Sequence, residues 1–72
     1  MKYNIGDLVV SDFSKTPGLI IEIYHDEECE IEWSTGSKDW YFEHEMDDYI
    51  NRKTLYYYPV NKWNIILVIL LW

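Results

Sequence analysis

The chain has 72 residues, a length that allows one small domain and excludes a multi-domain protein. Its formal net charge of −7 repels phosphate backbones, so direct nucleic-acid binding is not expected. The single cysteine, Cys29, excludes an internal disulfide. No paired Cys/His spacing predicts a structural zinc site, and we expect neither a metal nor a cofactor.

The first two predicted strands lie on either side of a short loop. Residues 7–11 predict the first strand, with Leu8 and Val10 on one face. Pro17 and Gly18 then introduce a second strand that continues to residue 24. One face of this second strand is expected to be formed by Leu19, Ile21 and Ile23.

Strict alternation over residues 29–33 predicts the third strand. Its inward side chains are expected to be Cys29, Ile31 and Trp33, and its water-facing side chains Glu30 and Glu32. Gly36 can supply a positive φ in the turn over residues 34–38, after which residues 39–42 predict a fourth strand.

The segment after the fourth strand is expected to close a small barrel. Residues 43–46 suit a 3₁₀ turn, and residues 47–50 a short fifth strand. Residues 55–58 predict an extra strand that Pro59 ends. The predicted fold is therefore all-β, with a barrel over residues 1–53 and a C-terminal extension over residues 54–72.

Five segments in order carry a resemblance to a known fold family: Gly6-Asp7-Leu8-Val9-Val10, Pro17-Gly18-Leu19-Ile20-Ile21-Glu22-Ile23, Cys29-Glu30-Ile31-Glu32-Trp33, Gly36, and Tyr41-Phe42-Glu43-His44-Glu45-Met46. Their layout resembles SH3-like Tudor and KOW barrels, and more narrowly the small SH3-like proteins of tailed bacteriophages. The resemblance covers about residues 3 to 50 and implies a single five-stranded SH3-like barrel that serves as a binding or structural module. KOW domains meet RNA with basic loops, whereas the loop over residues 25–28 is acidic here.

Catalysis and metal binding are both weakly supported by the side chains present. Cys29 could act as a nucleophile with His25 or His44 as its base, but its place on an inward strand face favours a small buried hydrophobe. The acidic runs over residues 25–28 and 43–48 lack the alternating ligands and central glycine of an EF-hand loop. The sequence therefore predicts no enzyme activity.

The aromatic residues predict a protein-binding surface. Four Trp, seven Tyr and two Phe exceed what so small a core needs, so some rings should be exposed or lie at an interface. Four of them could line an aromatic cage for a cationic side chain: Phe13, Tyr24, Trp40 and Tyr41.

The last eight residues of the sequence are apolar without interruption. They are too few to span a bilayer, which takes roughly 20 residues. The segment either folds back onto its own barrel or inserts into a neighbouring chain, and a hinge over residues 61–64 favours the second arrangement. The docking residues predicted here are Trp63, Ile65, Ile66, Leu67, Val68, Ile69, Leu70, Leu71 and Trp72.

These features predict a non-enzymatic protein-binding or structural module that forms a homo-oligomer or part of a larger assembly. A phage virion component, such as a capsid decoration or tail accessory protein, is the preferred function. The alternative is an acidic inhibitor or nucleic-acid mimic that occupies a basic site on a host enzyme. Residues 1–5 do not predict a signal peptide, so the virion or the host cytoplasm is the expected location.

Overall fold

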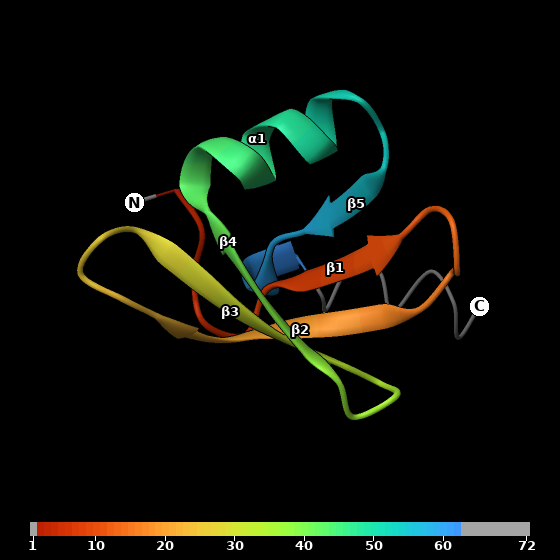
Figure 1. The fold of residues 1–72 in the computed structure, drawn as a ribbon, viewed down its shortest axis with the longest axis horizontal. Coiled ribbons are helices and arrows are strands. Elements are labelled where there is room, and N and C mark those ends of the chain that lie inside the picture. Colours follow the sequence, from red (N-terminus) through yellow and green to blue (C-terminus); the bar gives the residue numbers. More distant parts are fainter. Residues whose placement is uncertain (1, 63–72) are drawn as a thin grey trace.

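The computed structural model describes residues 2–62, which form one five-stranded antiparallel sheet and one short α-helix (Figure 1). The strands are ordered β4-β3-β2-β1-β5. Hairpins therefore connect β1 to β2, β2 to β3 and β3 to β4, and the last strand, β5, returns to pair with β1. The elements in chain order are β1 (Leu8–Ser11), β2 (Pro17–Ile23), β3 (Glu28–Trp33), β4 (Lys38–Phe42), α1 (Glu43–Asn51), β5 (Leu55–Tyr58) and the 3₁₀ helix η1 (Val60–Lys62).

The predicted β-rich class and the first four strands are confirmed. Gly36 has a φ of 91°, as expected for the turn between β3 and β4. The strand over residues 55–58 is also confirmed, but it is no appendage to the sheet, because its four residues pair with β1 from Leu8 to Ser11.

The segment between β4 and β5 was predicted wrongly, because it forms α1 and not a 3₁₀ turn followed by a strand. Glu45 stabilises the start of the helix by accepting a hydrogen bond from the backbone N–H of Phe42 at 3.0 Å. Met46 is fully buried, and Tyr49 and Ile50, one turn further on, also pack on the core. This packing stabilises a helix that would be too short to form in isolation.

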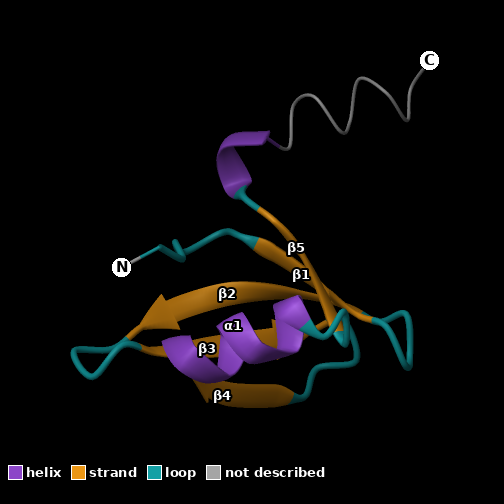
Figure 2. Cartoon of the chain, turned by 90° about the horizontal axis from the view of Figure 1, so that it is seen from above, coloured by secondary structure: helices purple, strands orange, loops and turns teal. Residues whose placement is uncertain are grey.

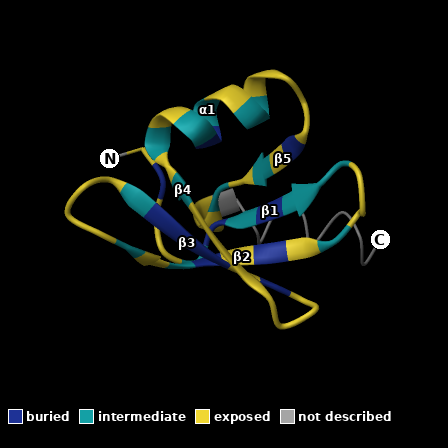
Figure 3. Cartoon of the chain, viewed as in Figure 1, coloured by how far each residue is buried: buried dark blue, intermediate teal, exposed yellow. Residues whose placement is uncertain are grey.

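The core lies between the sheet and α1, which packs against both β4 and β5 (Figures 1 and 2). Figure 3 shows the buried segments on β2, β3 and the inner side of the helix. The third strand contributes the three predicted side chains, which are buried as expected: Cys29, Ile31 and Trp33. Glu32 is exposed as predicted.

Two details of side-chain burial differ from what the alternation in the sequence predicts. The core-facing residue of β2 is Ile20, and a register shift between Ile20 and Glu22 brings Ile23 to the core while Leu19 stays exposed. The bulge therefore splits the face predicted for this strand. Glu30 was expected to face water but is only 7% exposed, because Tyr24 and Lys38 cover its carboxylate.

A buried carboxylate ties the two ends of the described chain together. Asp7 is fully buried, and its carboxylate accepts hydrogen bonds from the backbone N–H of Asn4 at 2.8 Å and the hydroxyl of Tyr57 at 2.6 Å. The backbone N–H of Val60 donates a third bond at 2.8 Å. Asp7 thus fixes the entry to β1, the end of β5 and the start of η1 relative to one another.

Candidate binding groove

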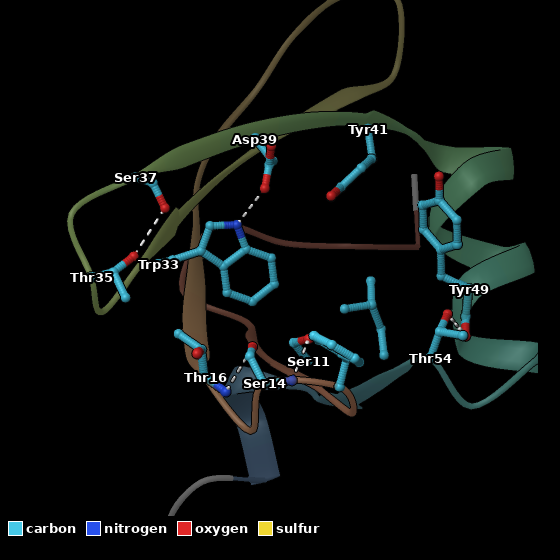
Figure 4. Close-up of a pocket in the computed structure, with 12 residues that line it drawn as sticks. Ser11, Ser14, Thr16, Trp33, Thr35, Ser37, Asp39, Tyr41, Tyr49 and Thr54 are labelled. Atoms are coloured by element: carbon cyan, nitrogen blue, oxygen red, sulfur yellow. Dashed lines mark hydrogen bonds between the residues drawn. The ribbon is translucent and has the colours of Figure 1, made fainter.

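An open groove with a volume of about 500 Å³ lies between the β1–β2 loop, the β3–β4 hairpin and the C-terminal end of α1 (Figure 4). We call it the aromatic groove. It is lined by Ser11, Phe13, Ser14, Thr16, Trp33, Thr35, Ser37, Asp39, Tyr41, Tyr49, Thr54 and Leu55. Asp39 is the one charged side chain in this set, so the lining combines aromatic surface, hydroxyl groups and a single negative charge.

The indole of Trp33 occupies the middle of the groove in Figure 4. Trp33 is the last residue of β3 and only 8% exposed, and its ring N–H donates a hydrogen bond to the carboxylate of Asp39 at 2.7 Å. Gly18 lies opposite Trp33 in the β2–β3 ladder. A Cβ atom at Gly18 would lie 2.6 Å from the indole carbon Cε3, so the ring needs a glycine at this position.

Two tyrosines line the groove on the side of the helix. The rings of Tyr41 on β4 and Tyr49 on α1 meet edge to face, with centroids 5.2 Å apart and an interplanar angle of 77°. Burial raises the pKa of the Tyr41 hydroxyl, and the negative charge of Asp39 raises it further. Tyr41 therefore stays neutral near pH 7, and Asp39 provides the negative charge of the groove.

The β1–β2 loop forms the opposite wall. Its backbone is fixed by a hydrogen bond from the N–H of Ser11 to the carbonyl of Thr16 at 3.0 Å and by another from the N–H of Lys15 to the carbonyl of Ser11 at 2.8 Å. Phe13 in this loop is 100% exposed. A fully exposed aromatic ring on an ordered loop beside a groove can contact a bound partner without first leaving the core.

The structure brings together two of the four predicted cage residues, because Phe13 and Tyr41 both line the aromatic groove. Tyr24 and Trp40 lie on the other face of the sheet, where the Tyr24 hydroxyl donates a hydrogen bond to Glu30 and Trp40 is the cross-strand partner of Glu30. The predicted docking residues Trp63 and 65–72 lie outside the described residues.

Three groove residues were missed as candidates for binding. Trp33 was predicted to be a core residue, which describes its burial but not its position at the open end of β3. Asp39 lies two residues before Tyr41 and therefore on the same side of β4. This spacing is the sequence signal that places Asp39 beside the predicted binding residue Tyr41. Tyr49 was assigned to a strand that does not exist, so the sequence did not place it near the groove.

The candidate catalytic residues, Cys29 with His25 or His44, lie outside the lining of the aromatic groove. Cys29 is fully buried, and burial raises the pKa of its thiol to about 11. Across residues 2–62, no group of three or more His, Cys, Asp or Glu side chains is arranged to hold a metal ion.

Comparison with known protein families, curated proteins and solved structures found no match to this chain. Among the described residues, no helix has both the length and the apolar character that crossing a membrane requires.

Proposed function

We propose that this chain is a non-enzymatic protein-binding module whose aromatic groove holds a basic side chain of a partner protein. The observation that carries the proposal is the combination of three rings, Trp33, Tyr41 and Tyr49, with Asp39 as the one charge in the lining. A lysine or arginine gains about 0.5 to 2 kcal/mol from contact with an aromatic face, depending on how far it is desolvated.

The shape and charge of the groove favour a side chain presented by an extended segment. The groove is open, and hydroxyl groups at its rim can bond the backbone of such a segment: Ser14, Thr16, Thr35 and Ser37. The net charge of −7 attracts basic partners from a distance and speeds their association. An acidic segment would instead meet the carboxylate of Asp39.

The wider fold proposal is that the sheet curls into an SH3-like barrel. Its support is the order β4-β3-β2-β1-β5 together with the position of α1, which joins β4 to β5 and packs against both. We further propose, from the sequence resemblance, that the module acts within a phage virion. Mass spectrometry of purified particles tests this location.

The binding proposal is tested with the full chain immobilised and exposed to an oriented peptide library in which one central position is fixed. We expect selection of Lys or Arg at the fixed position and rejection of Asp and Glu. Selection of acidic peptides, or no preference at the fixed position, would contradict the proposal.

Matched substitutions then place the interaction in the groove. Asp39→Asn and Phe13→Ala should each weaken binding of the selected peptide by about 3- to 10-fold, a cost of about 0.7 to 1.4 kcal/mol. Asp48→Asn and Phe42→Ala remove similar side chains outside the groove and should leave the affinity unchanged.

Salt dependence separates this proposal from the acidic-inhibitor alternative. Groove binding should lose less than about 10-fold in affinity between 50 and 200 mM salt, because the basic side chain pairs with a single carboxylate, that of Asp39. A nucleic-acid mimic, which needs many exposed carboxylates, should lose its basic partner steeply.

A further inference from the structure

The side of the sheet away from the core carries a continuous apolar surface on β5, β1 and β2. The strand register places Tyr58, Leu8 and Leu19 in one cross-strand row. The neighbouring row consists of Tyr56, Val10 and Pro17. We call these six residues the outer apolar face.

The outer apolar face is accessible and bears no charge of its own. Leu19 is 38% exposed and Tyr56 39% exposed, and a shallow hollow of about 380 Å³ lies beside Leu8 and Leu19. Glu32 marks the edge of this hollow, and the outer side of the sheet beyond it carries glutamates. An apolar occupant is therefore favoured on this face and disfavoured beyond its edge.

The sequence supplies an apolar segment shortly after the last described residue, Lys62. Residues 65–72 are eight apolar residues in succession, and η1 ends at Lys62. The start of η1 is fixed next to β1, because the backbone N–H of Val60 donates to Asp7, the residue before Leu8. The ten residues after Lys62 span about 33 Å when fully extended, whereas three neighbouring strands are only about 10 Å wide. The segment is therefore long enough to cross the outer apolar face.

We propose that the outer apolar face is the docking site of residues 65–72 of the same chain. A segment tethered this close to its site has an effective concentration in the millimolar range, so docking within the chain outcompetes docking on a second copy at ordinary protein concentrations. The face is then covered without a partner, and the aromatic groove is the surface through which the module binds other proteins.

The test is a paramagnetic relaxation measurement on the full chain. A nitroxide is attached to Leu70→Cys, and broadening of amide signals is recorded in a ¹⁵N-labelled sample diluted with an excess of unlabelled, unmodified chain. The chain without an added cysteine controls for labelling of Cys29, which is fully buried. A nitroxide at Asn51→Cys, which is exposed on α1, is the positional control.

We expect the label at residue 70 to broaden the amide signals of Leu8, Val10 and Leu19, and the label at residue 51 to leave them sharp. The substitution Leu19→Asp places a charge on the outer apolar face and should restore these signals in the chain labelled at residue 70. Phe13→Asp, which lies outside this face, should not restore them. A second sample mixes nitroxide-labelled chains that contain no ¹⁵N with ¹⁵N-labelled chains that carry no nitroxide. Broadening only in this second sample would show that a second copy is the occupant. Sharp signals in both samples would show that the segment docks elsewhere, and either result overturns the proposal.

Discussion

The bonds of Asp7 predict a large loss of stability when its charge is removed. In Asp7→Asn, an NH₂ group replaces one carboxylate oxygen and faces a hydrogen-bond donor in either orientation of the amide. In one orientation the donor is the N–H of Val60, and in the other the donors are the N–H of Asn4 and the hydroxyl of Tyr57. Hydrogen bonds to charged groups contribute about 1.5 to 3 kcal/mol each, and an unsatisfied buried donor costs about 1 to 3 kcal/mol. We therefore expect the free energy of unfolding to fall by about 2 to 4 kcal/mol.

That loss is a large part of the total for a domain of this size. At 0.05 to 0.15 kcal/mol per residue, a 72-residue domain has a stability of about 4 to 11 kcal/mol. Urea unfolding followed by tryptophan fluorescence measures the change as a lower midpoint. Asp48→Asn is the matched control, because Asp48 is exposed and forms a surface ion pair with Arg52, so its loss should cost less than about 1 kcal/mol.

A double-mutant cycle with Tyr57→Phe isolates one of the three bonds. Tyr57→Phe alone should cost about 1 to 2 kcal/mol, and much less in the Asp7→Asn background, because the two groups share the interaction. The reasoning is refuted if Asp7→Asn costs no more than Asp48→Asn, or if the effects of Asp7→Asn and Tyr57→Phe simply add.

Three further predictions concern other parts of the sheet. Gly18→Ala should destabilise the fold by about 1 to 3 kcal/mol and shift the Trp33 emission, because the added methyl group overlaps the indole; unchanged emission would contradict this. The hydrogen bond from Tyr24 lowers the pKa of Glu30, so its charge stabilises the fold above about pH 4.3, the pKa of an unfolded glutamate. That contribution is lost as the pH falls through the lower pKa of Glu30 in the folded state. The difference in free energy of unfolding between the native chain and Glu30→Gln, measured by urea unfolding, should therefore shrink over this pH range. A constant difference would refute the lowered pKa of Glu30. Cys29 should react with a thiol reagent at pH 8 only after urea unfolding, because burial raises its pKa to about 11; fast reaction of the folded chain would refute this.

The strands could be predicted from the sequence because their signal is local. Residues 29–33 alternate strictly, and the structure buries Cys29, Ile31 and Trp33 as this alternation requires. The exceptions have tertiary causes. Glu30 follows the alternation in direction but is covered by the side chains of Tyr24 and Lys38. The bulge after Ile20 interrupts the pattern on β2.

The helix and the groove depend on contacts that single segments do not contain. The helix α1 is short and acidic, and Met46 stabilises it only by packing on a sheet formed from distant residues. Predicting the groove requires both the β3–β4 register and the position of Tyr49, and a strand over residues 47–50 does not place Tyr49 on a helix beside β4. The excess of aromatic residues correctly indicated exposed rings such as Phe13, but not which of them meet.

The central claim is that the aromatic groove binds a basic side chain, and an NMR titration of the ¹⁵N-labelled full chain with the selected peptide tests it most directly. We expect the largest shifts in the indole N–H of Trp33 and in the amides of Phe13, Asp39 and Tyr41, and no such shifts with a peptide in which glutamate replaces the basic residue. Equal shifts with both peptides, or shifts confined to other faces of the sheet, would contradict the claim.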